Sequence, residues 1–200
     1  WLYTIYQLIN YFVQDEKTET ITVSCETWVA PKGGNNCGLC NERSILGCSE
    51  YECKSYGQAC GILNPGTEEE KCTFISSNDV SSPLIQPLDD VLKAPYKTQR
   101  TTNGYRITPN IKPFDKITMG IKINEPSQCK IDNAINKKYD DMQNFFGSAL
   151  YLTEHKVTFN IPAEATQELA LEVTNGGKYN FYVRCQDANG NQNEALPKIF

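Results

Sequence analysis

The chain has 200 residues, 40% of them hydrophobic, and a formal net charge of -5 from 19 basic and 24 acidic side chains. This composition can build a core, which excludes a disordered tail, and an acidic chain without a basic run is a poor partner for nucleic acid. Nine cysteines and a single histidine favour an oxidising, extracellular setting and exclude His-rich metal centres.

The N-terminal segment, taken as residues 1–24, opens with an uncharged apolar run from Trp1 to Val13. Its apolar residues recur at helical spacing, which predicts a helix with one interface face. The run is shorter than the roughly 20 apolar residues that span a bilayer. Three roles therefore stay open: an assembly helix, the end of a membrane anchor, or packing on its own domain. The residues expected at an assembly interface are Leu2, Ile5, Ile9, Phe12 and Val13.

Residues 25–78 form a Cys-rich zone with few aliphatic side chains, which predicts a small module held together by disulfides. We expect six of its seven cysteines to pair, in a connectivity that the sequence leaves open. Zinc bound by Cys37, Cys40, Cys48 and Cys53 is an alternative, although the spacing departs from that of zinc ribbons. A redox pair of Cys37 and Cys40 is another. The seven cysteines are Cys25, Cys37, Cys40, Cys48, Cys53, Cys60 and Cys72.

Residues 79–95 contain three prolines among polar residues and are predicted as a linker or a first strand. Residues 96–200 alternate between apolar and polar side chains, which predicts short strands in an antiparallel sandwich. Four spaced apolar residues between the strands, Tyr139, Met142, Phe145 and Phe146, predict one or two helical turns. The predicted strands cover residues 117–123, 155–161, 169–173 and 179–185, with a hairpin turn at Asn189 and Gly190.

The run GKYNFYVRCQDANGN, at residues 177–191, resembles the penultimate strand and turn of fibronectin type III and of bacterial or archaeal immunoglobulin-like domains. The run NEPSQCKID, at residues 124–132, is similar to a companion segment in surface proteins of archaea and bacteria, and residues 48–72 look like a module of archaeal surface proteins. The resemblance implies an immunoglobulin-like β-sandwich, with Tyr179 at the sandwich corner. It also implies a bridge between Cys129 and Cys185, which we expect to tie the two sheets together.

The family would continue its final strand where this sequence reaches residues 197–200. We therefore expect an incomplete sheet edge, which the N-terminal segment or tail of another copy can complete. The alternative is that the final strand continues past residue 200.

Few residues point to chemistry. Asp187, Asn189 and Asn191 offer oxygen ligands at alternate positions, which makes a weak calcium candidate, while an Asx-type turn explains the same residues. His155 is expected to be a core or boundary residue. No nucleotide, hydrolase or zinc-peptidase motif occurs, and no cofactor is expected. Candidate positions for O-linked glycan are Ser81, Ser82, Thr101 and Thr102.

The apolar start, the cysteine usage and the open edge together predict a non-enzymatic, extracellular cell-surface protein. We expect it to assemble with copies of itself into a helical filament, a pilus-like fibre or a layer. The alternative is a membrane-tethered adhesion or carbohydrate-binding module whose aromatic residues stack on the ligand: Trp28, Tyr51, Tyr56 and Tyr105. A third class, a secreted enzyme that uses a cysteine or His155, requires that His155 be accessible to solvent.

Overall fold

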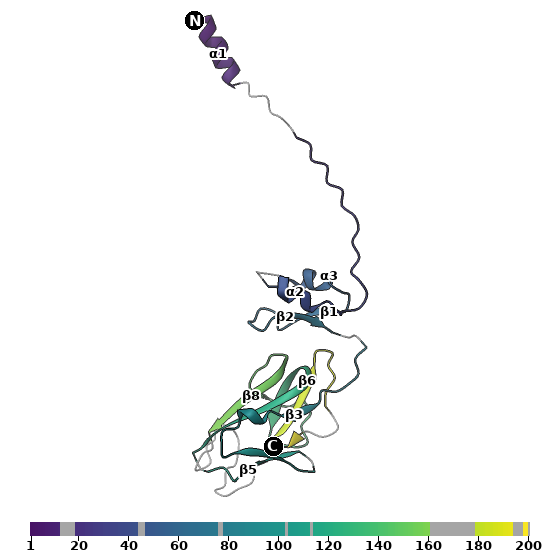
Figure 1. Cartoon of the computed structure of the whole chain (residues 1–200), viewed down its shortest axis with the longest axis vertical. Helices are drawn as coiled ribbons and strands as arrows, with labels where there is room; N and C mark the ends of the chain where they lie inside the picture. The colour runs from purple at the N-terminus through teal and green to yellow at the C-terminus, as the bar shows by residue number, and fades with distance from the viewer. Residues whose placement is uncertain are drawn as a thin grey trace.

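The computed structural model describes residues 1–12, 19–43, 47–75, 78–102, 104–112, 114–160, 179–193 and 198–199. Within these ranges the chain is mainly β, with antiparallel strands and four disulfides, which confirms the fold class at this level. Figure 1 shows three parts in chain order: a helix on a long extended segment, a small module, and a larger β domain.

The N-terminal helix α1 spans Leu2–Phe12. The carbonyl of Trp1 accepts the backbone N–H of Ile5 and the hydroxyl of Thr4, which closes the first turn. From residue 19 to residue 30 the chain is extended. It is attached to the small module at its end, where the carbonyl of Pro31 accepts the backbone N–H of Gln58 at 3.0 Å.

The Cys-rich module packs two short helices, α2 (Gly38–Arg43) and α3 (Glu50–Ser55), against a hairpin of β1 (Cys60–Leu63) and β2 (Lys71–Phe74). Ser49 caps α3, because its hydroxyl accepts the N–H of Glu52 at 3.2 Å. The buried core of this module consists of cysteines, with Tyr56 and Ile62 packed against them. The bridges join Cys37 to Cys60, Cys40 to Cys48 and Cys53 to Cys72.

The larger domain is organised around β6 (Lys116–Asp132). Its first half pairs with β3 (Ile85–Pro87) and with β8 (Leu152–Asn160). Both neighbours pair with Lys122, so they lie on opposite sides of β6. The second half of β6 pairs with β7 (Asn144–Phe145) and β9 (Tyr182–Asp187), and β9 pairs with β10 (Lys198–Ile199). Residues 85–87 of the predicted linker therefore belong to the sheet.

The core of this domain lies against the inner face of β6, whose predicted apolar side chains, from Ile117 to Ile123, are buried. A separate hairpin of β4 (Lys97–Arg100) and β5 (Tyr105–Thr108) packs Tyr105 and Ile107 against this core. A short 3-10 turn, η1 (Asp89–Val91), precedes the hairpin. Its Val91 lies over Gly120, where a β-carbon would come within 2.7 Å of that side chain. The strand predicted at residues 169–173 lies outside the described residues.

The helical turns predicted from Tyr139, Met142, Phe145 and Phe146 are wrong. The backbone there forms turns, and Phe145 belongs to β7, opposite Lys130 of β6. Tyr139, Met142 and Phe146 are nevertheless buried. Apolar residues three positions apart can reach one core from successive turns as well as from a helix face, so the spacing identified the buried side chains and not the backbone conformation.

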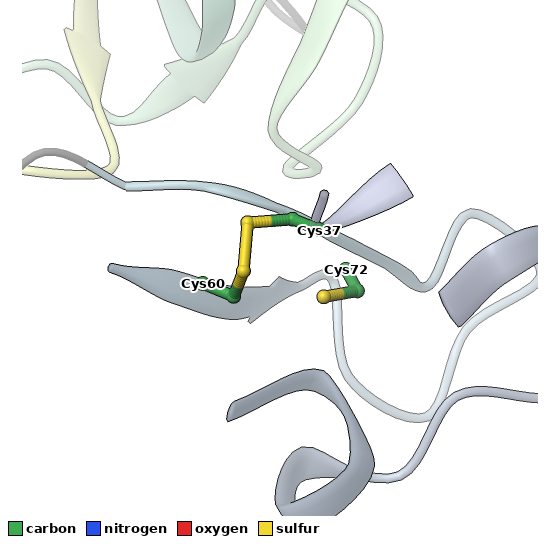
Figure 2. Close-up of side chains that lie close together, drawn as sticks. All are labelled: Cys37, Cys60 and Cys72. Carbon is green, nitrogen blue, oxygen red and sulfur yellow. A yellow bond between two sulfur atoms is a disulfide. The ribbon is translucent and has the colours of Figure 1, made fainter. Parts of the chain in front are cut away.

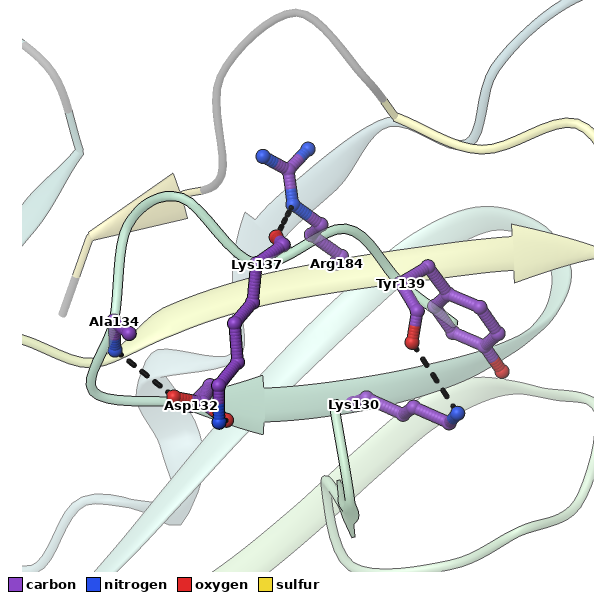
Figure 3. A network of polar contacts seen from close by, with 6 residues as sticks. All are labelled: Lys130, Asp132, Ala134, Lys137, Tyr139 and Arg184. Carbon is purple, nitrogen blue, oxygen red and sulfur yellow. Dashed lines mark hydrogen bonds and ion pairs between the residues drawn. The ribbon is translucent and has the colours of Figure 1, made fainter. Parts of the chain in front are cut away.

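Polar contacts fix this irregular loop on the sheet (Figure 3). Asp132, at the end of β6, forms an ion pair with Lys137 at 2.8 Å and accepts the backbone N–H of Ala134. Arg184 of β9 donates from Nε to the carbonyl of Lys137 at 2.8 Å. The loop is thus held by groups on two neighbouring strands, and it needs no helical hydrogen bonds.

The structure contains the expected bridge between Cys129 and Cys185, but its expected position between two sheets is wrong. The two residues face each other across the β6–β9 ladder, so the bridge lies within one sheet. Both are fully buried in the core. The expectation failed because β6 extends through residues 124–128, which brings Cys129 into the strand next to Cys185.

Candidate functional site

The N-terminal helix carries apolar side chains that the described residues leave uncovered. Leu2 is 87% exposed, and Ile5 and Leu8 on the same side of α1 are also exposed. No helix in the described part of the chain is both long and apolar enough to cross a membrane. Of the five predicted interface residues, Leu2 and Ile5 are open to solvent. The side chains of Ile9 and Phe12, and all of Val13, lie outside the description.

The numbers of paired and unpaired cysteines are those predicted from the sequence, and the structure shows which cysteines pair. Six of the seven in the Cys-rich zone form bridges, and Cys25 is free and exposed in the extended segment. The four sulfurs considered as zinc ligands are all in disulfides, so neither the zinc set nor the redox pair is available in this oxidised state. Figure 2 shows the sulfur of Cys72 beside the bridge of Cys37 and Cys60; the three sulfurs lie within 4.8 Å of one another.

The Cys-rich module is joined to the β domain by Asn64, which follows β1. Its side chain pairs with the backbone of Tyr151 in both directions: Oδ1 accepts the N–H at 2.7 Å, and Nδ2 donates to the carbonyl at 3.0 Å. Asn64 is buried and has φ of 53°, a left-handed conformation that asparagine tolerates better than most residues. This contact, which the sequence analysis missed, fixes one module against the other.

Three carboxylates, from Asp79, Glu125 and Asp187, meet near this junction, with oxygens within 4.8 Å of one another. They line a cavity of about 190 Å³ together with Phe74 and Asn189. Burial and the negative charges of Asp187 and Asp79 raise the pKa of Glu125. Such a group of oxygens is what a hard cation such as calcium prefers. The alternation of apolar and polar residues along the sequence could not reveal this cluster, because its three carboxylates come from distant segments.

The calcium candidate proposed from the sequence has a different role. Asp187 Oδ1 accepts the backbone N–H groups of Asn189 and Asn191, both at 2.8 Å, and Oδ2 accepts the side-chain amide of Asn191 at 2.8 Å. These bonds close the turn after β9, so the Asx-type alternative describes this segment. Asp187 also belongs to the acidic cluster, and Asn189 lines the cavity beside it.

His155 is buried, with 2% of its surface exposed, and it lines neither the cavity beside Tyr96 nor the cavity at the acidic cluster. Its Nε2 donates to the carbonyl of Ser127 at 2.8 Å, where the register between β6 and β8 shifts. Its Nδ1 is buried without a hydrogen-bond partner. Burial lowers the pKa of His155, and the carbonyls of Ser127, Leu152 and Phe146 oppose this effect. The condition that a catalytic His155 requires, access to solvent, is not met.

The four aromatic residues of the carbohydrate-binding alternative are spread over the molecule. Trp28 lies in the extended segment and Tyr51 in α3, both exposed. Tyr56 packs on the disulfide core, and Tyr105 packs on the core of the β domain. No contact in the described structure gathers the four into one ligand-stacking surface.

Comparisons of this chain with protein-family models, with curated proteins and with solved structures found no match. A function for this chain is therefore argued from its own residues. The exposed apolar helix and the extended segment that follows it are the strongest candidates for a functional site.

Proposed function

We propose that this chain is an extracellular structural subunit that assembles with copies of itself into a filament, a pilus-like fibre or a surface layer. In this proposal the β domain is an immunoglobulin-like sandwich of the kind found in archaeal and bacterial cell-surface proteins. Helix α1 and its exposed apolar face form the assembly interface, and the disulfide-linked modules form the body of the subunit.

The observation that carries the proposal is the exposure of α1. An isolated helix of 11 residues is marginal in water, because most of the stability of so short a helix comes from packing. This helix has no charged residue, and no described residue covers Leu2, Ile5 or Leu8. An apolar surface of this kind marks a contact with another molecule. For a structural subunit that polymerises, the molecule that covers this apolar surface is a second copy of the same chain.

The four disulfides support the proposed extracellular location. Bridges of this density form and persist in oxidising environments such as the cell exterior. They also suit a polymer outside the cell, because cross-linked modules resist unfolding without any cofactor or cellular energy source.

The test compares two double variants of α1 by negative-stain electron microscopy and light scattering. L2D/I5D places charges on the apolar face, and T4D/Q7D places the same charges on the polar face of the same helix. We expect the first to abolish assembly and the second to retain it. Equal assembly by both variants, or unchanged filaments after deletion of residues 1–14, would contradict the proposal.

The second candidate is an adhesion or carbohydrate-binding module tethered to a membrane by its N-terminus. The exposed aromatic rings of Trp28 and Tyr51 favour it. A monodisperse monomer that binds a glycan array, and loses that binding in W28A and Y51A, would support this candidate over self-assembly.

A further inference from the structure

The extended segment Thr20–Val29 has the pattern of a β-strand, and no described strand pairs with it. Apolar residues occupy alternate positions at Ile21, Val23 and Cys25, with Val29 in the same phase, and the positions between Ile21 and Cys25 are threonine and serine. Such alternation is typical of a strand with one buried face. In the structure Ile21 is 80% exposed and Val23 is 75% exposed.

A strand of this kind needs a neighbour. Its backbone N–H and C=O groups pair with no strand in the described part of the chain, and β-branched residues favour a pleated, half-buried surface. In the described part of the chain, the segment is held just after its C-terminal end, where the carbonyls of Ala30 and Pro31 accept hydrogen bonds from Gln58. From there it projects away from the module (Figure 1). Its ten residues can extend about 33 Å, which is far enough to reach a neighbouring molecule.

The β domain has a matching edge on β8. One side of β8 pairs with β6, and no described strand pairs with the other side. Gly147 comes against the carbonyl of Lys156, where an added β-carbon would lie 2.0 Å from the oxygen. Among the described residues, the part of this edge that no strand or loop contacts runs over residues 157–160. Here the inward side chains of Val157 and Phe159 pack on the core but are only partly buried.

Two other outer strands, β3 and β4, suit an added strand less well. Strand β3 has three residues and includes Pro87, which lacks a backbone N–H. Strand β4 reads Lys97, Thr98, Gln99 and Arg100, with no apolar side chain to extend a core and two positive charges that discourage edge pairing.

We propose that residues Thr20–Val29 of one copy add as a strand to the edge of β8 in a second copy, with Ile21, Val23 and Cys25 covering Val157 and Phe159. This rests on the self-assembly proposed above and names the surface that receives the N-terminal segment. The added strand satisfies backbone groups on both chains, buries the exposed Ile21 and Val23, and further covers the partly buried Val157 and Phe159. Because each copy has one donor and one acceptor, the contact is head-to-tail and can propagate.

The test uses a matched pair of variants within the segment. I21E/V23E places charges on the apolar face of the strand, and T22E/S24E places the same charges on the polar face. Two measurements are made on assembled wild-type chain and on both variants. The first is hydrogen exchange at residues 20–29 and 157–160. The second is the alkylation rate of Cys25 by iodoacetamide, since Cys25 is the one cysteine outside the four bridges.

We expect assembly to slow exchange in both segments and to slow alkylation of Cys25 at least about tenfold in the wild-type chain and in T22E/S24E, but not in I21E/V23E. Cross-linking a mixture of isotope-labelled and unlabelled copies should join the segment of one copy to β8 of another. Cross-links found only within single copies would overturn the inference, because the segment would then complete its own sheet. Assembly with Cys25 still reactive would overturn it but leave self-assembly through α1 standing. The absence of any assembly would refute both.

Discussion

Removing the bridge between Cys129 and Cys185 tests how the β domain is held together. The bridge joins residues 56 positions apart, and in the chain-entropy account a closed loop of this length stabilises the fold by about 4 kcal/mol. Both side chains are also buried in the core, so C129A/C185A removes two packed sulfur atoms as well. Since single domains are stable by about 5–15 kcal/mol, we expect the double variant to lose much of that stability.

The measurement is unfolding in guanidinium followed by far-ultraviolet circular dichroism. Tryptophan fluorescence is unsuitable, because Trp1 and Trp28 lie outside both disulfide-bonded modules. The matched control is C25A, which removes an exposed free thiol and should change the free energy of unfolding by less than about 0.5 kcal/mol. Hydrogen exchange should accelerate along β6 and β9, while the Cys-rich module with its own three bridges keeps its protection. A loss below about 1 kcal/mol, or faster exchange in the module alone, would refute the reasoning.

Three further outcomes follow from the buried His155 and Asn64 and the partly buried Glu125. The lowered pKa of His155 means that the folded chain binds fewer protons than the unfolded chain below about pH 6.5, so stability should fall as the pH drops below that value. The imidazole signal of His155 in proton NMR should titrate below pH 6.5, and H155Q should remove the loss of stability at acid pH. Titration of the signal at the ordinary value of 6.5 would contradict this prediction. N64G keeps the left-handed backbone but removes both hydrogen bonds to Tyr151. The amide hydrogen of Tyr151 should therefore exchange faster, and the free energy of unfolding should fall by about 1–3 kcal/mol. Unchanged exchange would mean that other contacts hold the junction. The raised pKa of Glu125 means that the free energy of unfolding decreases as the pH rises from 4.5 to the raised value. E125Q removes this charge and should stabilise the chain at neutral pH by a few tenths of a kcal/mol. Equal unfolding midpoints of E125Q and the wild-type chain at pH 7 would argue against repulsion in the cluster.

The sequence predicted the elements whose signal is local. Alternation located the strands at Ile117 and His155, because side chains of a half-buried strand face opposite sides at each step. The count of cysteines placed the unpaired thiol in the Cys-rich zone, and Cys25 is that residue. The same alternation in residues 20–29 was visible in the sequence, and it was the exposure of that segment in the structure that showed its significance.

Other features depended on contacts between distant segments. The pairing of six cysteines follows from which sulfurs meet when α2, α3, β1 and β2 pack together, and spacing alone does not determine this. The acidic cluster unites Asp79, Glu125 and Asp187 across more than a hundred positions of sequence. The predicted helix near Tyr139 failed because hydrogen bonds from β6 and β9 hold that loop in turns.

By itself, then, the sequence determined the mainly β composition and the uncharged apolar start, and it predicted how many cysteines pair, because each follows from residue type and local period. Only the tertiary structure decided how the cysteines pair, that Asn64 joins the modules, and that Val157 and Phe159 stand half-buried at an edge of β8 that no described strand pairs. These features depend on contacts between segments that are distant in the sequence. The local pattern of residues along the chain does not reveal which segments come into contact on folding.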